Sequence, residues 1–356
     1  MSEATAPFGR ARAPVLHRFA FRGAGAEFFR IWIVNLALTL VTLGIYSAWA
    51  KVRTRRYFYG NTFVADHSFD YHAAPLRILL GRAIALALFA GYNISGRISP
   101  LLTIPWILFF AVAIPWLIVS SQRFNARNTS YRNVRFNFGG DYWGAFKAFI
   151  LWPLAGMATL GGLMPLAHRA RDYYLVNHRS YGGKPFNTSF AGKSIYKIYL
   201  LALLTLILAT FVIAASWVIL SLIFGHTGGS PRGQLAATTI IVIPIFAIAW
   251  VAILTYIGAA ALKLTLEKTS LDGRHKLSTD LRPSAMVWIA VSNLVLVLIT
   301  IGIFYPWARV RYSRYLADHM ALLAATDLDG FTSQVFATQS AVGEEIAGFF
   351  DFDIGL

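Results

Sequence analysis

The chain has 356 residues, of which 57% are hydrophobic and 13% are charged. That charged share is about half of the usual value for a globular domain, which excludes an ordinary soluble protein. Cysteine is absent, which excludes disulfides, thiolate metal sites and cysteine nucleophiles. The formal net charge is +16, and the basic residues lie beside apolar segments, so we expect anionic phospholipid headgroups rather than nucleic acid as partners.

Residues 1–26 form a basic N-terminal segment without a signal peptide. Arg10, Arg12, Arg18 and Arg22 fall within it, and neither an apolar core region nor a small-residue cleavage site separates them. We expect a cytoplasmic N-terminal tail.

Seven long apolar segments follow, and a helix that crosses the hydrocarbon core needs about 20 such residues. We therefore predict an all-α integral membrane protein with about seven hydrophobic segments in a membrane domain at 27–320. The segments are 31–49, 84–92 with its flanks, 101–120, 148–167, 198–224, 235–262 and 286–307.

An internal repeat links the two ends of this domain. Residues 44–53 and 302–311 are identical at six of ten positions, and tyrosine aligns with phenylalanine and lysine with arginine at two more. A degenerate third copy lies at 159–174. Repeats of this kind indicate recurring structural units, so we define three motif segments, 28–57, 146–174 and 286–315.

Short polar segments beside the motifs alternate aromatic and polar residues. Phe69 and Tyr71 flank a polar residue, as do Phe136 and Phe138. Alternation with period two is typical of strands, so we expect short strands or hairpins outside the bilayer.

The positions of Lys and Arg favour one of two topologies. Of the 32 basic residues, 30 lie outside the turns near 93–101 and 225–234, which contain only Arg97 and Arg232. Cytoplasmic loops are enriched in basic residues. Seven alternating spans would remove this bias, whereas two crossing hairpins (76–122 and 195–264) with re-entrant or shallow motif segments would place every basic loop and both termini in the cytoplasm. We favour the second topology; the length of 31–49 supports the first.

Two aromatic–basic clusters are candidate contacts for an anionic headgroup or a small anionic solute. Arginine offers bidentate donors to phosphate, and the alternative is ordinary anchoring of tryptophan and arginine at the membrane interface. The candidates are Trp49, Lys51, Arg53, Arg56, Trp307, Arg309, Arg311 and Arg314.

Asn35 and Asn293 occupy equivalent apolar positions, with Thr42 and Thr300 seven residues later on the same helix face. They are interpreted as interhelical hydrogen-bonding groups, or alternatively as the lining of a polar path.

Evidence for catalysis in the sequence is thin. No ionisable residue lies at the centre of a long apolar run, which argues against a proton-coupled transporter. We predict no catalytic residue, metal site or cofactor. The alternative is a membrane-embedded enzyme acting on a lipid, and a pair of Asp172 with His168 or His178 facing a cytoplasmic pocket would favour it.

Residues 321–356 form an acidic tail with six acids and no Lys or Arg. Val342, Ile346, Phe349 and Phe350 have the spacing of one helical face. We expect this cytoplasmic tail to dock onto the basic surface rather than remain a solvated extension.

These motifs resemble the YjgN family of bacterial inner-membrane proteins, a domain family of unknown function. The resemblance rests on residues 42–53, 306–311, 343–346 and 351–356; Ala48 departs from it, since proline is expected there and Pro306 occupies the equivalent position. It implies an inner-membrane location and no known activity. Our leading interpretation is a non-enzymatic protein, a candidate homo-oligomer, that binds or moves a lipid or small anionic solute, or organises the membrane.

Overall fold

The computed structural model describes residues 14–225, 231–326, 328, 330–333, 335 and 336, and short strands alternate in it with helical hairpins. The strands are β1 (Val15–Phe21), β2 (Thr62–Val64), β3 (His67–Tyr71), β4 (Thr129–Tyr131), β5 (Val134–Phe138), β6 (Arg179–Tyr181), β7 (Lys184–Thr188), β8 (Thr269–Leu271), β9 (His275–Thr279) and β10 (Met320–Ala324). The helices are α1 (Gly25–Val41), α2 (Ser47–Gly60), α3 (Pro75–Ile98), α4 (Thr103–Arg127), α5 (Tyr142–Phe146), α6 (Trp152–Ala158), α7 (Met164–Asn177), α8 (Gly192–Gly225), α9 (Pro231–Glu267), α10 (Pro283–Ile299) and α11 (Tyr305–Asp318). A 3₁₀ turn, η1 (Pro100–Leu102), precedes α4, and a π-helical turn, η2 (Lys147–Leu151), joins α5 to α6.

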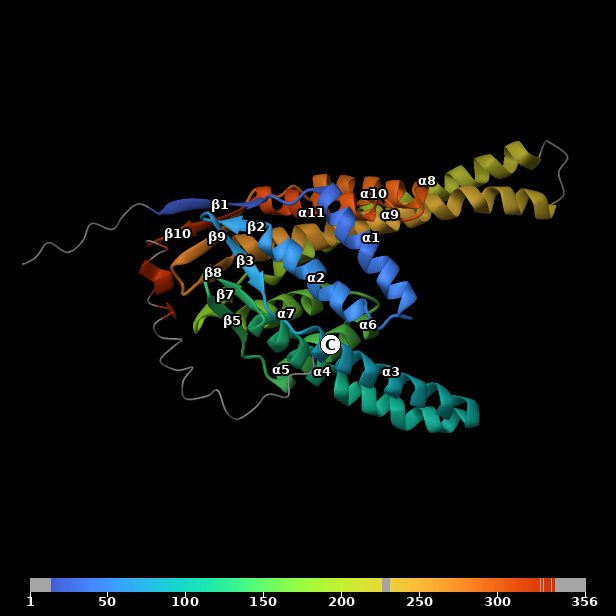
Figure 1. Cartoon of the computed structure of the whole chain (residues 1–356). Coiled ribbons are helices and arrows are strands. Elements are labelled where there is room, and N and C mark those ends of the chain that lie inside the picture. The colour runs from blue at the N-terminus through green and yellow to red at the C-terminus, as the bar shows by residue number, and fades with distance from the viewer. Residues whose placement is uncertain (1–13, 226–230, 327, 329, 334, 337–356) are drawn as a thin grey trace, which may run out of the picture.

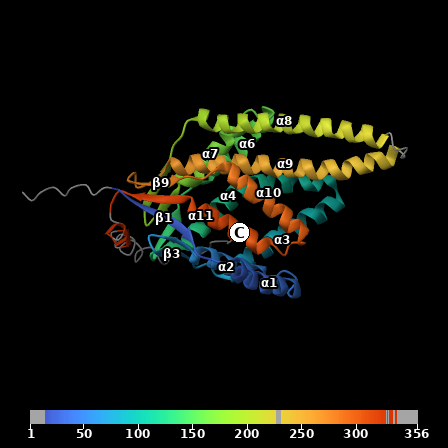
Figure 2. The ribbon, with the colours of Figure 1, turned by 90° about the horizontal axis from the view of Figure 1, so that it is seen from above.

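The ten strands close into an antiparallel barrel in the order β1-β10-β9-β8-β7-β6-β5-β4-β3-β2. Val15 pairs with Ala324, so the first and last strands are neighbours, and β1 also pairs with β2 through Phe19 and Val64. Closure leaves no unpaired sheet edge. Figures 1 and 2 show the strands gathered at one end of the molecule and the helical hairpins extending from the other.

Tight turns set the register of the barrel hairpins. Both central residues have positive φ at Ala65–Asp66, Arg132–Asn133 and Gly182–Gly183. Such two-residue turns match the twist of the flanking strands. Register is therefore fixed at the turns, and it places the alternating aromatic side chains on the inner face.

Stacked phenylalanines fill the barrel. Phe69 stacks on Phe19 with centroids 6.4 Å apart and on Phe136 at 6.3 Å, and Phe136 stacks on Phe186 at 6.3 Å. The buried hydroxyl of Tyr131 donates to the Val64 carbonyl at 2.7 Å. These partly buried phenylalanines pack against the buried residues Val64, Tyr131, Val134, Tyr181 and Leu271, so the barrel has a hydrophobic core of its own.

Three of the five helical hairpins are short and turn in the same way. The amide of Gly44 donates to the Thr39 carbonyl, that of Gly161 to Gly156 and that of Gly302 to Val297, at 2.7–2.8 Å. These six-to-one bonds with a positive-φ glycine are Schellman motifs. The preceding residue also has positive φ and is almost fully exposed: Leu43 (95%), Leu160 (99%) and Ile301 (93%).

A tyrosine in the second arm holds the start of each short hairpin. The hydroxyl of Tyr57 donates to the Ala24 carbonyl at 2.9 Å, and Tyr174 donates to Asp141 at 2.7 Å. Tyr315 donates to Arg282 at 3.3 Å. Burial and the hydrogen bond with Glu27 raise the pKa of Tyr57 to about 12, so its phenol remains a donor.

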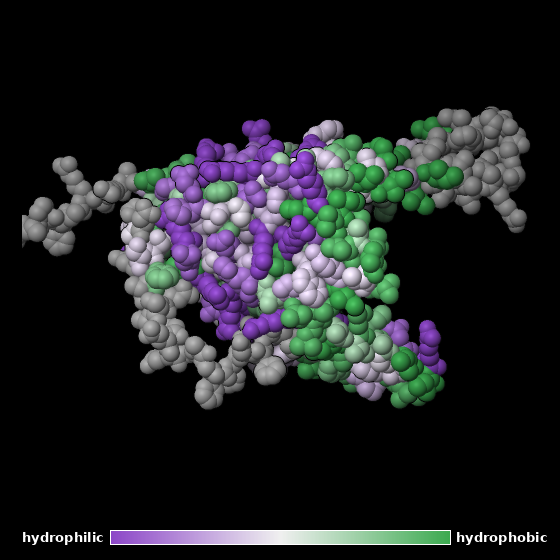
Figure 3. All heavy atoms as spheres, in the orientation of Figure 1, coloured by the Kyte–Doolittle hydropathy of each residue, from purple (hydrophilic) through white to green (hydrophobic). Residues whose placement is uncertain are grey.

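Four helices are long and apolar enough to cross a membrane: Pro75–Ile98, Pro100–Arg127, Gly192–Ile219 and Val242–Glu267. At most 17% of any of these spans is buried within the molecule, so their apolar surfaces need another apolar environment. Figure 3 shows hydrophilic residues over the strand end and hydrophobic residues over the helical end. The chain is thus a mostly helical membrane protein.

The predicted fold class needs two corrections. The helix count is not seven, because a glycine turn divides each motif segment into two shorter helices. Four helices among the described residues are candidate spans, the number expected in the favoured topology, and they overlap the hairpins predicted at 76–122 and 195–264. The description as all-α was wrong: short strands were expected beside the motifs, but strands of three to seven residues close into a complete barrel.

Phe331 and Val335, which follow the last strand, pack against the core of the barrel. Phe331 stacks on Tyr181 with centroids 6.5 Å apart, and Val335 is buried beside the turn at Gly182. The predicted docking of Phe349 and Phe350 falls outside the described residues, which end at Phe336.

We predict that Gly182→Ala displaces this C-terminal segment. A Cβ there would lie 1.8 Å from Val335 Cγ1, and φ is +53°. Gly183 is a matched control: its φ is +86°, but nothing lies within 4 Å of the added atom, so alanine there costs only the backbone strain of about 1–2 kcal/mol.

Thermal unfolding in detergent and proteolysis of the C-terminal segment measure the two effects. Gly182→Ala should lower the melting temperature more than Gly183→Ala and expose the segment to protease. Equal behaviour of the two variants would show that the segment does not pack on this turn.

Candidate anion-binding site

A cavity of about 390 Å³ lies where the first and last helical hairpins meet. Helices α1 and α2 form most of its wall, and α11 closes it because the barrel brings α11 beside α1. Its polar lining consists of Asn35, Thr39, Ser47, Thr54 and the cations Lys51, Arg55 and Arg309.

The cations of this cavity lack carboxylate partners. Burial lowers the pKa of Lys51, and the neighbouring charges of Arg55 and Arg82 lower it further. Within the part of the chain that the structure describes, no ion pair joins any of these groups or Arg309 to an acid. Like charges that line one cavity repel one another, and an anion bound among them would relieve this repulsion.

Neutral hydrogen-bond acceptors hold two of these cations in place. Arg55 donates to the Tyr71 hydroxyl at 2.6 Å and to the side-chain oxygen of Asn125. Arg82, on α3, donates to the hydroxyl of Ser47, which lines the cavity. These contacts fix the guanidinium groups without neutralising them.

Of the predicted contacts, the structure brings Lys51 and Arg309 together at this cavity. Arg53 is exposed, and Arg56 donates to the Tyr71 carbonyl at 3.2 Å. Trp49 stacks on Tyr46 with centroids 6.1 Å apart. These three residues lie on α2 but do not line the cavity.

The other predicted residues surround a second cavity of about 650 Å³, lined in part by Trp307, Arg311 and Arg314. Arg314 donates to the Gly23 carbonyl at 2.9 Å. Asp318 also lines this cavity, so a carboxylate is already present there. The first cavity is therefore the better candidate for an anion.

Sequence reasoning missed Arg55 as a lining residue and Arg82 as the residue that donates to Ser47 of the lining. It selected Arg53 and Arg56 as one helical face, whereas Lys51 and Arg55, four residues apart, share the face that meets the cavity. That spacing was the available signal. Nothing in the sequence places Arg82 beside Ser47, because α3 reaches the cavity only through tertiary packing.

The two equivalent asparagines have different surroundings. Asn293 donates to the Ala308 carbonyl at 3.2 Å and accepts from Arg311 at 3.2 Å, so it makes the interhelical hydrogen bonds expected of it. Asn35 lines the cavity, and its side-chain nitrogen and oxygen are buried without a partner among the described residues.

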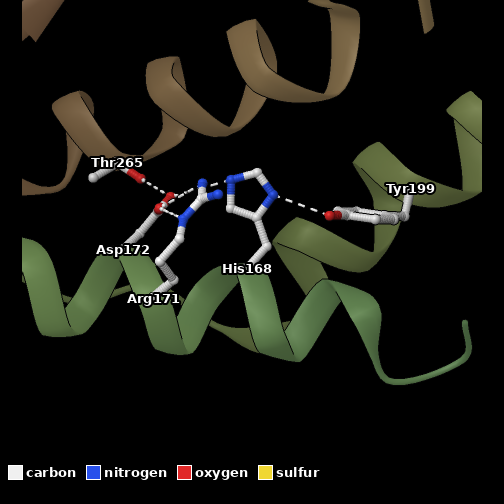
Figure 4. Close-up of polar contacts among 5 residues, drawn as sticks. All are labelled: His168, Arg171, Asp172, Tyr199 and Thr265. Atoms are coloured by element: carbon white, nitrogen blue, oxygen red, sulfur yellow. Dashed lines mark hydrogen bonds and ion pairs between the residues drawn. The ribbon is translucent and has the colours of Figure 1, made fainter. Parts of the chain in front are cut away.

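The structure also forms the Asp172–His168 pair considered in the enzyme alternative (Figure 4). His168 Nε2 lies 3.5 Å from Asp172 Oδ2, and His168 Nδ1 lies 3.0 Å from the hydroxyl of Tyr199. Arg171 and Thr265 donate to the two carboxylate oxygens of Asp172. Burial lowers the pKa of His168, against the opposing charge of Asp172.

Every polar atom of this pair is thus engaged by α7, α8 or α9, and the pair lines none of the cavities named above. His178, the other histidine considered, lies 4.0 Å from Asp141 instead. The arrangement joins α7 to the long hairpin of α8 and α9.

Comparison with known proteins gives a family but no activity. A family model described as a bacterial protein of unknown function (DUF898) matches residues 16–349. The inner membrane protein YjgN of Salmonella typhimurium is 23% identical over 352 residues, covering 85% of this chain and 87% of the relative. A protein of the same name from Escherichia coli is 32% identical over 151 residues, covering 40% of this chain and 37% of the relative. No solved structure matches.

The match spans nearly all of the described barrel and all five helical hairpins. The chain therefore belongs to the YjgN family of bacterial inner-membrane proteins of unknown function.

Proposed function

We propose that this protein is a multi-pass inner-membrane protein, built from internal repeats, that binds a phosphate-bearing anion at its cytoplasmic membrane face. The ligand class that fits best is an anionic phospholipid headgroup. The observation that carries the proposal is the cavity whose cations Lys51, Arg55 and Arg309 have no carboxylate partner among the described residues.

The location of the cavity supports a lipid as the source of the phosphate. Ser47, which lines it, opens α2 just after the exposed hairpin tip at Leu43. An almost fully exposed leucine is unfavourable in water and favourable in hydrocarbon. If the three tips enter the bilayer, the cations of the first turns of α2, behind the tip, lie at headgroup depth.

The repeat supports the same placement for both aromatic–basic clusters. Tyr46 stacks on Trp49, and Phe304 stacks on Trp307, each pair with centroids 6.1 Å apart. Equivalent stacking puts the two tryptophans in equivalent positions on their hairpins, as expected of belt residues.

A membrane-embedded lipid enzyme is the second candidate, and the His168–Asp172 pair is the feature that would serve it. The saturated hydrogen bonding of that pair argues for a structural role instead. We therefore favour binding over catalysis.

We predict that Lys51→Ala or Arg309→Ala weakens binding of phosphatidylglycerol by about tenfold or more, because a hydrogen bond to a charged group contributes about 1.5–3 kcal/mol. Arg53→Ala is the matched control, since it removes the same charge from α2 at an exposed position outside the cavity. Titration of the detergent-solubilised full chain with a short-chain lipid measures the affinity.

Arg53→Ala should lose only a small part of the binding free energy, and this loss should disappear at high salt. Equal losses of affinity in all three variants would mean that lipid binding depends on the overall surface charge rather than on the cavity.

We predict that this affinity falls as the pH rises through the lowered pKa of Lys51. The free protein holds that pKa below 10.5, whereas a bound phosphodiester would raise it. Binding is therefore strongest where Lys51 is already protonated in the free protein, and weakens between the free and bound pKa values.

Lys51→Arg should abolish this dependence, because the arginine stays charged throughout. The same titration repeated across alkaline pH for both proteins checks this. An unchanged pH profile in Lys51→Arg would exclude Lys51 from the site.

We predict that a cysteine replacing Ser99 reacts with an impermeant thiol reagent in intact cells, while one replacing His67 does not. Ser99 lies between α3 and α4, at the far end of a candidate hairpin, and His67 is an exposed residue of the barrel. After permeabilisation both should react. Labelling of position 67 in intact cells would contradict a cytoplasmic barrel.

A further inference from the structure

We propose that Asn35 selects the ligand of this site, and that the ligand is a phosphodiester whose headgroup carries a hydroxyl, of the glycerophosphate type. This inference rests on the proposed anion binding and adds the chemistry of the headgroup. The observation behind it is the amide of Asn35, which has no partner among the described residues and lies in a cavity whose other polar lining residues are hydroxyls and cations.

Asn35 is 4% exposed, and neither its amide nitrogen nor its amide oxygen has a hydrogen-bond partner among the described residues. A buried amide without partners costs free energy that a partner recovers. A ligand that supplies both an acceptor and a donor would satisfy the group completely.

In the equivalent residue, Asn293, both hydrogen-bonding groups of the side-chain amide have a partner. Asn293 donates to the Ala308 carbonyl and accepts from Arg311. In the first copy the aligned arginine, Arg53, is exposed, so it does not close the site. One copy is therefore complete within the protein, and the other lacks both partners.

The positive charges of the cavity favour a ligand whose hydrogen-bond donor is neutral. The Asn35 nitrogen donates to an acceptor such as a phosphate oxygen, while its oxygen requires a donor. An ammonium group would meet the repulsion of Lys51, Arg55 and Arg309. A neutral hydroxyl next to the phosphate meets both needs without that repulsion, which favours a polyol headgroup over ethanolamine.

A headgroup can reach Asn35 only if a side chain that lines the cavity moves. Because the residue is nearly buried, a headgroup must displace part of the wall to reach it. Lys51 is the adaptable part, with a flexible four-carbon chain and no hydrogen bond to the protein among the described residues. Arg55 is held by Tyr71 and Asn125 and stays in place.

Lipid competition on the detergent-solubilised full chain tests the inference. Phosphatidylglycerol, phosphatidic acid and phosphatidylethanolamine are added in equal amounts, and native mass spectrometry counts the bound lipids. We expect phosphatidylglycerol to exceed each of the others by about tenfold, which corresponds to about 1.4 kcal/mol.

Asn35→Leu should remove the preference for phosphatidylglycerol over phosphatidic acid while anionic lipid still binds. Leucine has a similar size and replaces an unpaired polar group, so this variant should fold; Asn35→Ala provides a second measurement. Asn293→Ala is the matched control, and it should keep the preference because that asparagine is already paired.

The outcomes separate the two proposals. Absence of any anionic preference in the unmodified protein would overturn the anion-binding function itself. Equal binding of phosphatidylglycerol and phosphatidic acid, with Lys51→Ala still harmful, would leave that function intact and overturn the role of Asn35, as would a preference for phosphatidylethanolamine. Free glycerol phosphate that competes as well as the lipid would support the headgroup chemistry and identify a soluble source.

Discussion

Closure of the barrel is the constraint on which the rest of this structure depends. Val15 and Ala324 pair although they come from opposite ends of the chain, and the hydrogen bonds between β1 and β10 complete the ring. An open sheet would expose unpaired backbone groups at both edges. Because the ring closes, the first and fifth helical hairpins become neighbours, and the cavity between α1, α2 and α11 exists only for that reason.

The helical hairpins divide into two classes with different physical tasks. Two are long and expose apolar surface along most of their length, as helices in hydrocarbon do. Three are short, end in an exposed apolar residue at a Schellman turn, and carry basic residues on their second arm. Basic side chains near the base and apolar side chains at the tip match the polarity gradient of a membrane interface.

The motif segments differ in how their polar groups are satisfied. At Asn293 the protein supplies both partners from α11, and the polar atoms of the His168–Asp172 pair are engaged by α7, α8 and α9. At Asn35 it supplies neither. Buried polar groups in proteins are nearly always paired, and this exception is the reason for proposing a ligand in the cavity beside Lys51.

The membrane character, the four long apolar segments and the recurring aromatic–basic motif were determined by the sequence alone. Hydropathy and charge depend on local composition, and a repeated motif is visible without any structure. The same holds for Lys51 and Arg309 as candidate contacts. The turns of the short hairpins were partly visible as well, since glycine follows a leucine or isoleucine in all three motif segments.

The barrel, the shared cavity and the partners of each cation were decided only by the tertiary structure. Strands of three to seven residues carry too little periodicity to reveal a closed sheet, and their pairing joins residues far apart in the chain. Arg309 lines the cavity and Arg82 donates to Ser47 of its lining, each from another hairpin, so no spacing along the sequence links them to Lys51. Asn35 and Asn293 look alike in sequence, and only the positions of Arg53 and Arg311 in space leave one amide unpaired.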